Sequence, residues 1–85
     1  MALFMIERQY ADQLELSSDS VREVEAINAD EDVRWVLSFL TADKLRSYCL
    51  YEAASPDAIL AAAHRAGLPA DVITEVSEVD PNVLR

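Results

Sequence analysis

The 85-residue chain has little glycine, cysteine or histidine, with only one residue of each. A single glycine excludes the glycine-rich loops that cradle phosphates in nucleotide-binding enzymes, and the chain has neither a G-x-S-x-G nor an H-E-x-x-H motif. One cysteine cannot form a disulfide within the chain, and one cysteine with one histidine is too few for a Cys/His zinc site. The sequence therefore gives no positive sign of an enzyme. A metal site built mainly from carboxylates, or shared between two chains, stays open.

Basic residues are also scarce: 7 face 16 acidic residues, which gives a formal net charge of −9. A chain this acidic repels phosphate backbones, so we expect no nucleic-acid partner. The chain contains no apolar run near the roughly 20 residues that a membrane span needs. The apolar run at residues 3–6 is too short for the core of a signal peptide. We therefore expect a cytoplasmic protein that does not enter a membrane.

The apolar content of 52% is high enough for folding, and 85 residues suffice for one domain, spanning residues 1–85. A domain of this size buries only about 60–65% of the surface that its unfolded chain exposes. A second copy of the chain is a natural cover for the remaining apolar surface. The size therefore favours a homodimer.

Apolar runs and helix caps divide the chain into six elements. The predicted strands span residues 3–8, 33–40, 45–53 and 72–79, and the predicted helices follow Ser20 and Ser55. Ser20 and Glu23 match the S-x-x-E capping box, in which each side chain accepts a hydrogen bond from the other residue's backbone. Ser55 precedes Pro56, the favoured first residue of a helix, and Gly67 is a typical helix stop.

The order β-α-β-β-α-β predicts an α+β protein with the ferredoxin-like fold. Right-handed crossovers place both helices on one face of a four-stranded antiparallel sheet, and the run at residues 3–8, apolar on both parities, predicts a central strand. The other face of the sheet needs a cover, which can be a ligand, water or a second subunit. The residues on that face decide the function.

The turn between the two hairpin strands decides which side chains share the uncovered face. Alternation puts Trp35, Leu37 and Phe39 together on one side of the second strand. A three-residue turn aligns them with Cys49 and Tyr51, whereas a two-residue turn aligns them with the residues of opposite parity. We favour the three-residue turn, because it leaves an apolar floor for the helices made of Val36, Leu40, Tyr48 and Leu50. The uncovered face then holds Trp35, Phe39, Cys49, Tyr51, Glu7 and Glu75.

Motifs spread over nearly the whole chain resemble a family of small bacterial ferredoxin-like proteins. The shared segments are Ile6-Glu7-Arg8, Val33-x-Trp35-Val36-x-Ser38-Phe39-Leu40, Asp43-Lys44, residues 48–53, Ser55-Pro56, residues 67–71 and 73–76, and Asp80-Pro81. Most members have no known function, but the family includes a nickel-binding protein. The resemblance implies a homodimer packed sheet to sheet, as in dimeric α/β barrels, with nickel or another divalent metal bound at the sheets or their interface.

Many family members carry histidine in a Trp-Val-His-Ser-Tyr motif where this chain has Leu37. Imidazole is a favoured nickel ligand, so this chain lacks that donor. The remaining candidate metal ligands are Glu7, Cys49, Tyr51, Glu52 and Glu75. Cys49 also fits a small buried core residue, since free cysteine is among the most buried residue types.

Two other functions stay open beside a metal-binding homodimer. Related dimeric α/β barrels include cofactor-free enzymes, so Trp35, Phe39 and Tyr51 could line a small-molecule pocket, with a glutamate as acid or base. This alternative rests on the fold alone. The third reading is a structural or regulatory dimer, in which the aromatic residues pack in the interface.

Overall fold

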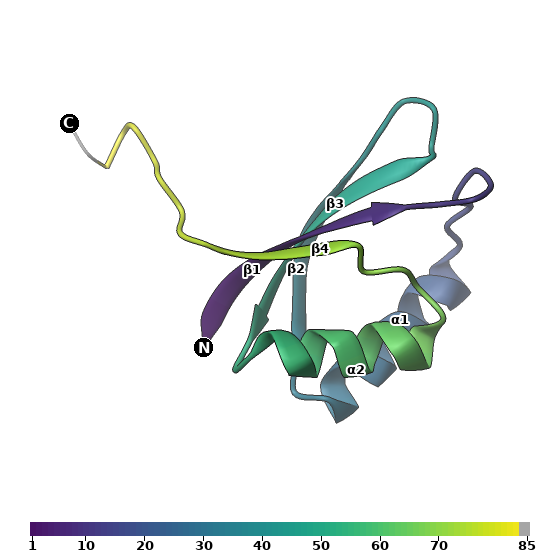
Figure 1. The fold of residues 1–85 in the computed structure, drawn as a ribbon, viewed down its shortest axis with the longest axis horizontal. Helices are drawn as coiled ribbons and strands as arrows, with labels where there is room; N and C mark the ends of the chain where they lie inside the picture. The colour runs from purple at the N-terminus through teal and green to yellow at the C-terminus, as the bar shows by residue number, and fades with distance from the viewer. Residues whose placement is uncertain (84–85) are drawn as a thin grey trace.

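The computed structural model describes residues 1–83 and has the predicted order of strands and helices (Figure 1). The strands are β1 (Ala2–Gln9), β2 (Arg34–Leu40), β3 (Arg46–Ala53) and β4 (Val72–Val76), and the helices are α1 (Ser18–Asp30) and α2 (Pro56–Ala66). The predicted ferredoxin-like fold is confirmed. Within residues 1–83, neither helix is long and apolar enough to cross a membrane.

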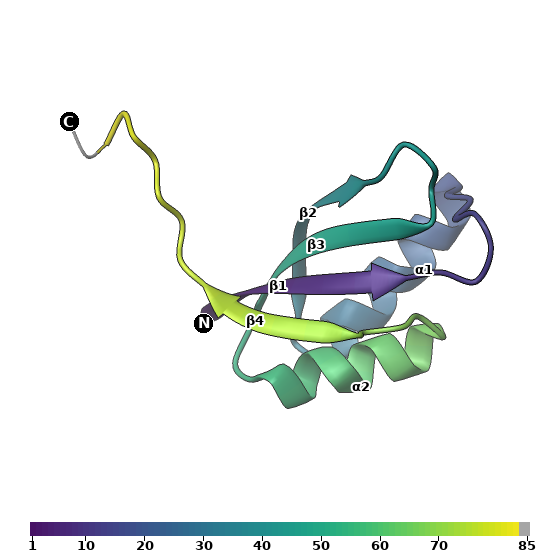
Figure 2. The same cartoon turned by 45° about the horizontal axis from the view of Figure 1, so that its top comes forward.

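The four strands form one antiparallel sheet in the order β2-β3-β1-β4. β1 lies in the centre, as predicted. Both helices lie on the same side of the sheet (Figures 1 and 2). We call the other side the open face, since no helix or strand of the described chain covers it. The segment after β4 leaves the domain on the side away from the helices.

The ends of α2 lie where predicted, whereas the start of α1 does not. Ser55 caps α2, and Gly67 ends it in the left-handed conformation with φ of 68°. The N-cap of α1 is Ser17: its hydroxyl accepts the backbone N–H of Ser20, and the Ser20 hydroxyl accepts that of Ser17. The predicted pairing of Ser20 with Glu23 is therefore wrong, because Ser20 is already the third residue of the helix.

The last strand is shorter than the predicted range 72–79. Its final pair joins Leu3 with Val76, and β1 begins at Ala2. Residues far beyond Val76 thus have no neighbouring strand to pair with. Val79 is accordingly 70% exposed.

A register shift in β2 puts Trp35 on a different face of the sheet from Leu37 and Phe39. The strand pairs are Phe39–Tyr48, Leu37–Leu50 and Trp35–Tyr51. The shift falls between Trp35 and Leu37, and because a β-bulge inserts an extra residue, alternation restarts on the other side of it. The turn spans residues 41–45, so the predicted three-residue turn is wrong. Phe39 and Leu37 follow one register, and Trp35 follows the other.

The third strand turns Cys49 and Tyr51 toward the helices, which corrects the predicted open face. Cys49 pairs with Ile6 and Tyr51 pairs with Phe4 on the central strand, and all four are buried. Because cross-strand partners share a face, these residues form the floor of the helical layer. The predicted floor is therefore wrong for Tyr48 and Leu50, which have the opposite parity and lie on the open face. Leu40 pairs with the buried Ser47 and lies on the helical side, as predicted.

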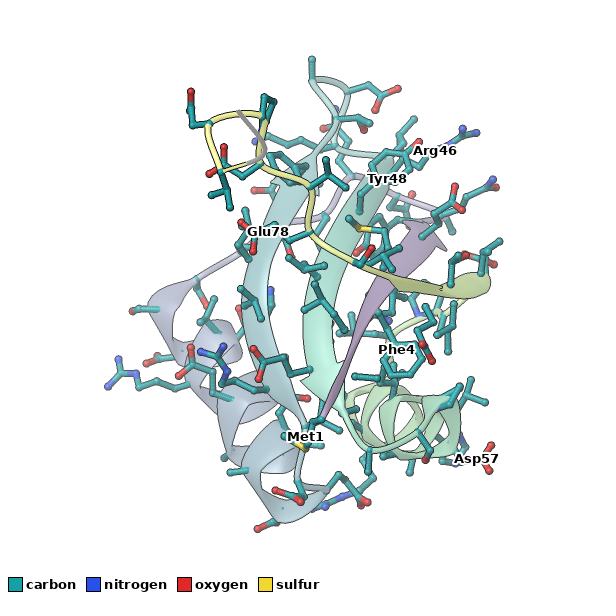
Figure 3. All side chains as sticks on the ribbon, turned by 90° about the vertical axis from the view of Figure 1, so that its left-hand side faces the viewer. Met1, Phe4, Arg46, Tyr48, Asp57 and Glu78 are labelled. Atoms are coloured by element: carbon teal, nitrogen blue, oxygen red, sulfur yellow. The ribbon has the colours of Figure 1, made fainter. Side chains whose placement is uncertain are left out.

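The open face carries many apolar side chains. Following the pairing and alternation of the strands, these are Leu3, Met5, Leu37, Phe39, Tyr48, Leu50, Val72 and Val76. The polar residues on the same face are Glu7, Gln9, Arg34, Arg46, Glu52 and Thr74. Phe39 is 59% exposed and Leu37 is 45% exposed. Figure 3 looks onto this face, with Tyr48 and Arg46 near the hairpin end of β3.

Candidate functional site

The structure separates the five candidate metal ligands between the two faces of the sheet. Glu7 lies on the open face, whereas Cys49 and Tyr51 are buried on the helical side. Glu75 pairs with Phe4, so it has the parity of the helical side, and it is exposed on the edge strand β4. Within residues 1–83, no three His, Cys, Asp or Glu side chains come close enough together to hold a metal ion. One chain therefore does not gather the predicted ligands.

Glu7 is half-buried on the open face without a partner in the described chain. Its cross-strand neighbours are Tyr48 on β3 and Val72 on β4. None of the ion pairs and side-chain hydrogen bonds within residues 1–83 involves its carboxylate. By contrast, the candidate Glu52 is held by Arg34, with 2.5 Å between nitrogen and oxygen. A carboxylate in apolar surroundings requires a cation, a hydrogen bond or water. Glu75 also has no such partner within residues 1–83, but it is exposed, so the half-buried Glu7 is the candidate that needs a cation most.

The predicted small-molecule pocket on the open face does not form. Phe39 lies on the open face, but Trp35 and Tyr51 pack together on the helical side, with ring centroids 6.4 Å apart and nearly parallel planes. Trp35 also donates a hydrogen bond of 2.7 Å from its indole N–H to Ser38 Oγ. The register shift separates Phe39 from the other two aromatic residues.

A cavity of about 180 Å³ lies on the helical side, and we call it the helix-side cavity. It is lined by residues of the sheet, α1 and the segment before α1, including Arg8, Tyr10, Leu14, Val24, Trp35, Ser47, Cys49 and Tyr51. α1 contacts α2 and the edge strand β2, and Asn28 is the one fully buried residue of this helix. The apolar stripe of α1 is therefore only half-buried, and the cavity lies beneath it.

The most buried charged group of the helix-side cavity is Arg8, which is 2% exposed. Its guanidinium donates a hydrogen bond to the Pro69 carbonyl oxygen and lies over the Tyr51 ring, with Cζ 5.9 Å from the ring centroid. Burial raises the pKa of the Tyr51 phenol, although the positive charge of Arg8 acts in the opposite direction. Tyr51 is thus a protonated hydroxyl near neutral pH, which makes it a poor metal ligand and a good hydrogen-bond donor.

A short hydrogen-bonded chain runs along the cavity side of β3. The Tyr10 hydroxyl lies 2.6 Å from Ser47 Oγ, and Ser47 Oγ lies 3.5 Å from Cys49 Sγ. Burial raises the pKa of Tyr10, and its bond to Ser47 partly offsets this effect. Cys49 is 6% exposed and belongs to the hydrophobic core. The thiol therefore fits the reading as a small buried core residue.

Arg8 and Asn28 are polar core residues that sequence reasoning missed. Asn28 Nδ2 is buried and forms no hydrogen bond of normal geometry within residues 1–83, but the Asn28 side chain lies close enough to the Tyr51 hydroxyl to lower its pKa. It lines a separate space of about 10 Å³ beside Arg8 and Tyr51, near the lower limit for one water molecule. Arg8 continues the alternation of Phe4 and Ile6, and this parity was the signal that a charged side chain enters the core.

Three comparisons relate the chain to known proteins. The sequence profile of the family described as "Nickel responsive protein SCO4226-like" matches residues 4–76. The crystal structure of SCO4226 from Streptomyces coelicolor A3(2) is similar, with a TM-score of 0.71 and 26% sequence identity. That alignment covers 93% of this chain and all of SCO4226. A comparison with curated protein sequences gives no match.

Proposed function

Since the chain belongs to the nickel responsive SCO4226-like family, we propose that it is a non-catalytic homodimer that binds a divalent metal, nickel by its family, at Glu7. The main support for this proposal is the half-buried Glu7 carboxylate, which forms no ion pair within residues 1–83. A divalent ion satisfies such a group directly. The cytoplasmic location stays a prediction from the sequence.

The metal site requires two copies of the chain. A single chain supplies no cluster of three His, Cys, Asp or Glu side chains within residues 1–83. A two-fold axis through the open face duplicates each residue, so two Glu7 carboxylates can approach one ion. Carboxylates are hard oxygen donors, and water molecules can complete the coordination of the ion.

The apolar side chains of the open face support the sheet-to-sheet dimer. Large side chains such as Phe39 and Leu37 are left in solvent in a single chain, and a patch of this kind marks an interaction site. The segment after β4 leaves the domain on the same side (Figures 1 and 2). Val79 in that segment is 70% exposed, which gives it apolar surface for a partner.

The position that carries histidine in many family members also lies on the open face. Leu37 pairs with Leu50 there, on the same side of the sheet as Glu7. An imidazole at this position therefore projects toward the proposed interface. This agreement supports the open face as the metal-binding side.

Cys49, Tyr51 and Glu75 have the parity of the opposite side, so the proposed site does not include them. Their part in metal binding stays a prediction that single variants test. Cys49 is the easiest of the three to test, because a thiolate bound to nickel gives a charge-transfer absorption that the Cys49→Ser variant would lack.

Isothermal titration with Ni²⁺ tests the proposal on protein prepared without a histidine tag and treated with a chelator. We expect Glu7→Gln to weaken nickel binding by at least about tenfold, because a lost ligand costs at least as much as the loss of an outer-shell partner. Glu25→Gln is the matched control, since it removes the same charge from an exposed site on α1. Equal affinities in the two variants would rule out Glu7. No nickel binding by the wild-type chain would leave the structural dimer as the better reading.

A further inference from the structure

The helix-side cavity contains a buried positive charge without a carboxylate partner. Within residues 1–83, the ion pairs involve Arg22, Arg34 and Arg65 but not Arg8. The side chain of Arg8 donates a hydrogen bond to the Pro69 carbonyl oxygen, and its interaction with the Tyr51 hydroxyl lowers the pKa of that group. A guanidinium has five N–H donors. Most of its donor capacity is thus unused inside the described chain.

A buried arginine of this kind is suited to an anion. Burying a charge is costly unless it is paired, and the Tyr51 ring beside Arg8 compensates only part of that cost. The planar guanidinium matches a carboxylate through two parallel hydrogen bonds. A bound carboxylate therefore supplies the counter-charge that the chain itself does not.

Neutral hydrogen-bond donors lie around the same space. The residues Tyr10, Tyr51 and Ser47 all line the cavity. The pKa of both tyrosines is raised by burial, so their hydroxyls keep their protons near neutral pH. Because Tyr10 and Ser47 already share one hydrogen bond, one hydroxyl of that pair and the Tyr51 hydroxyl can each donate to a carboxylate that is held by Arg8.

The remaining lining limits the ligand to one negative charge and an apolar body. Trp35, Leu14 and Val24 provide apolar wall. Glu15 and Glu23 also line the cavity, and both are exposed, so they lie toward solvent. Their charges repel a second anionic group on the ligand. The ligand that fits is a monocarboxylate with an apolar ring or chain.

We infer that the helix-side cavity binds a small apolar monocarboxylate, with the carboxylate on Arg8 and the apolar part against Trp35. An apolar cavity of about 150 Å³ holds a benzene molecule, and this cavity measures about 180 Å³. The inference does not depend on the metal proposal, because Glu7 and the cavity lie on opposite faces of the sheet.

Benzoate and benzyl alcohol test the inference in the wild-type protein, since they share a ring and differ in charge. Trp35 is the single tryptophan, so its fluorescence reports on the cavity without a label. We expect a Kd for benzoate at least about tenfold below that for benzyl alcohol, because hydrogen bonds to charged groups are the stronger ones. Equal Kd values would overturn the inference. So would unchanged fluorescence at up to about 10 mM benzoate, well above millimolar affinity.

Three variants locate the binding. Arg8→Gln should bring the two Kd values together, whereas Arg46→Gln, at an exposed arginine of β3, should preserve the preference for benzoate. Val24→Phe fills the cavity from α1 and leaves Arg8 in place, so it should abolish binding of both probes. A benzoate preference retained in Arg8→Gln, or full benzoate binding in Val24→Phe, would overturn the assignment. If Arg8→Gln fails to fold, the comparison of the two probes in the wild-type protein and the Val24→Phe variant still test whether the cavity binds a carboxylate.

Discussion

Replacing Phe39 with aspartate should separate the proposed homodimer into monomers. Phe39 lies on β2, pairs with Tyr48, and is 59% exposed in a single chain. A sheet-to-sheet dimer covers this ring in both copies. The aspartate removes the apolar contact and also places a charge in the interface, where it lacks a partner.

The exposed fraction of Phe39 sets the size of the effect. Burying a whole phenylalanine side chain stabilises by about 1.5–3 kcal/mol. Covering the exposed part therefore contributes about 1–2 kcal/mol per copy, or about 2–4 kcal/mol per dimer, because a two-fold axis buries the ring twice. Each 1.4 kcal/mol is a factor of about ten in affinity, so the dimer Kd should rise by about 30-fold to 1,000-fold.

Analytical ultracentrifugation over a dilution series measures this Kd directly. Leu60→Asp is the matched control: Leu60 is 46% exposed on α2, outside the open face, and its substitution should leave the dimer intact. Two results would contradict the proposed dimer. One is a wild-type chain that sediments as a monomer throughout, and the other is a Phe39→Asp variant with the wild-type dimer Kd.

Four other variants probe the site and the fold. Leu37→His should tighten nickel binding by about tenfold or more in isothermal titration, since imidazole is a favoured nickel ligand; unchanged affinity would place the metal away from this position. Cys49→Ser should keep wild-type nickel affinity, since Cys49 is buried on the helical side; a clear loss of affinity would indicate that the Cys49 thiol binds the metal. Gly67→Ala should destabilise the chain by about 1 kcal/mol, or about 4–8 °C in Tm, because φ is 68° there although space around it is open. The pKa of Tyr51 is raised in the folded chain, so its contribution to the free energy of unfolding is fully present below pH 10.0, the ordinary pKa of tyrosine. That contribution is lost as the pH rises above this value. Tyr51→Phe should weaken that alkaline loss in urea unfolding, and an unchanged pH profile would contradict the burial argument.

The order of elements could be predicted because its signals are local. Ser55, Pro56 and Gly67 mark the ends of α2 through capping and backbone preferences that depend on a few neighbouring residues. The run at residues 3–8 is apolar on both parities, which predicted the central position of β1 in the sheet. These features need no knowledge of distant contacts.

The faces of the hairpin could not be predicted, because they depend on register. The shift between Trp35 and Leu37 is set by pairing with β3, and a single extra residue exchanges the two faces. Cys49 and Tyr51 lie in the core because they pair with the buried Ile6 and Phe4 of β1, whereas Glu7 has the opposite parity on that strand. The burial of Arg8 could have been predicted from the sequence, since Arg8 shares the parity of Phe4 and Ile6.

Anomalous scattering at the nickel absorption edge, from crystals of the tag-free protein grown with Ni²⁺, would locate the bound metal. We expect a nickel peak between two copies packed through their open faces, within coordination distance of the Glu7 carboxylate. A nickel peak beside Cys49 on the helical side, or a dimer whose Glu7 residues bind no metal, would contradict the proposed site.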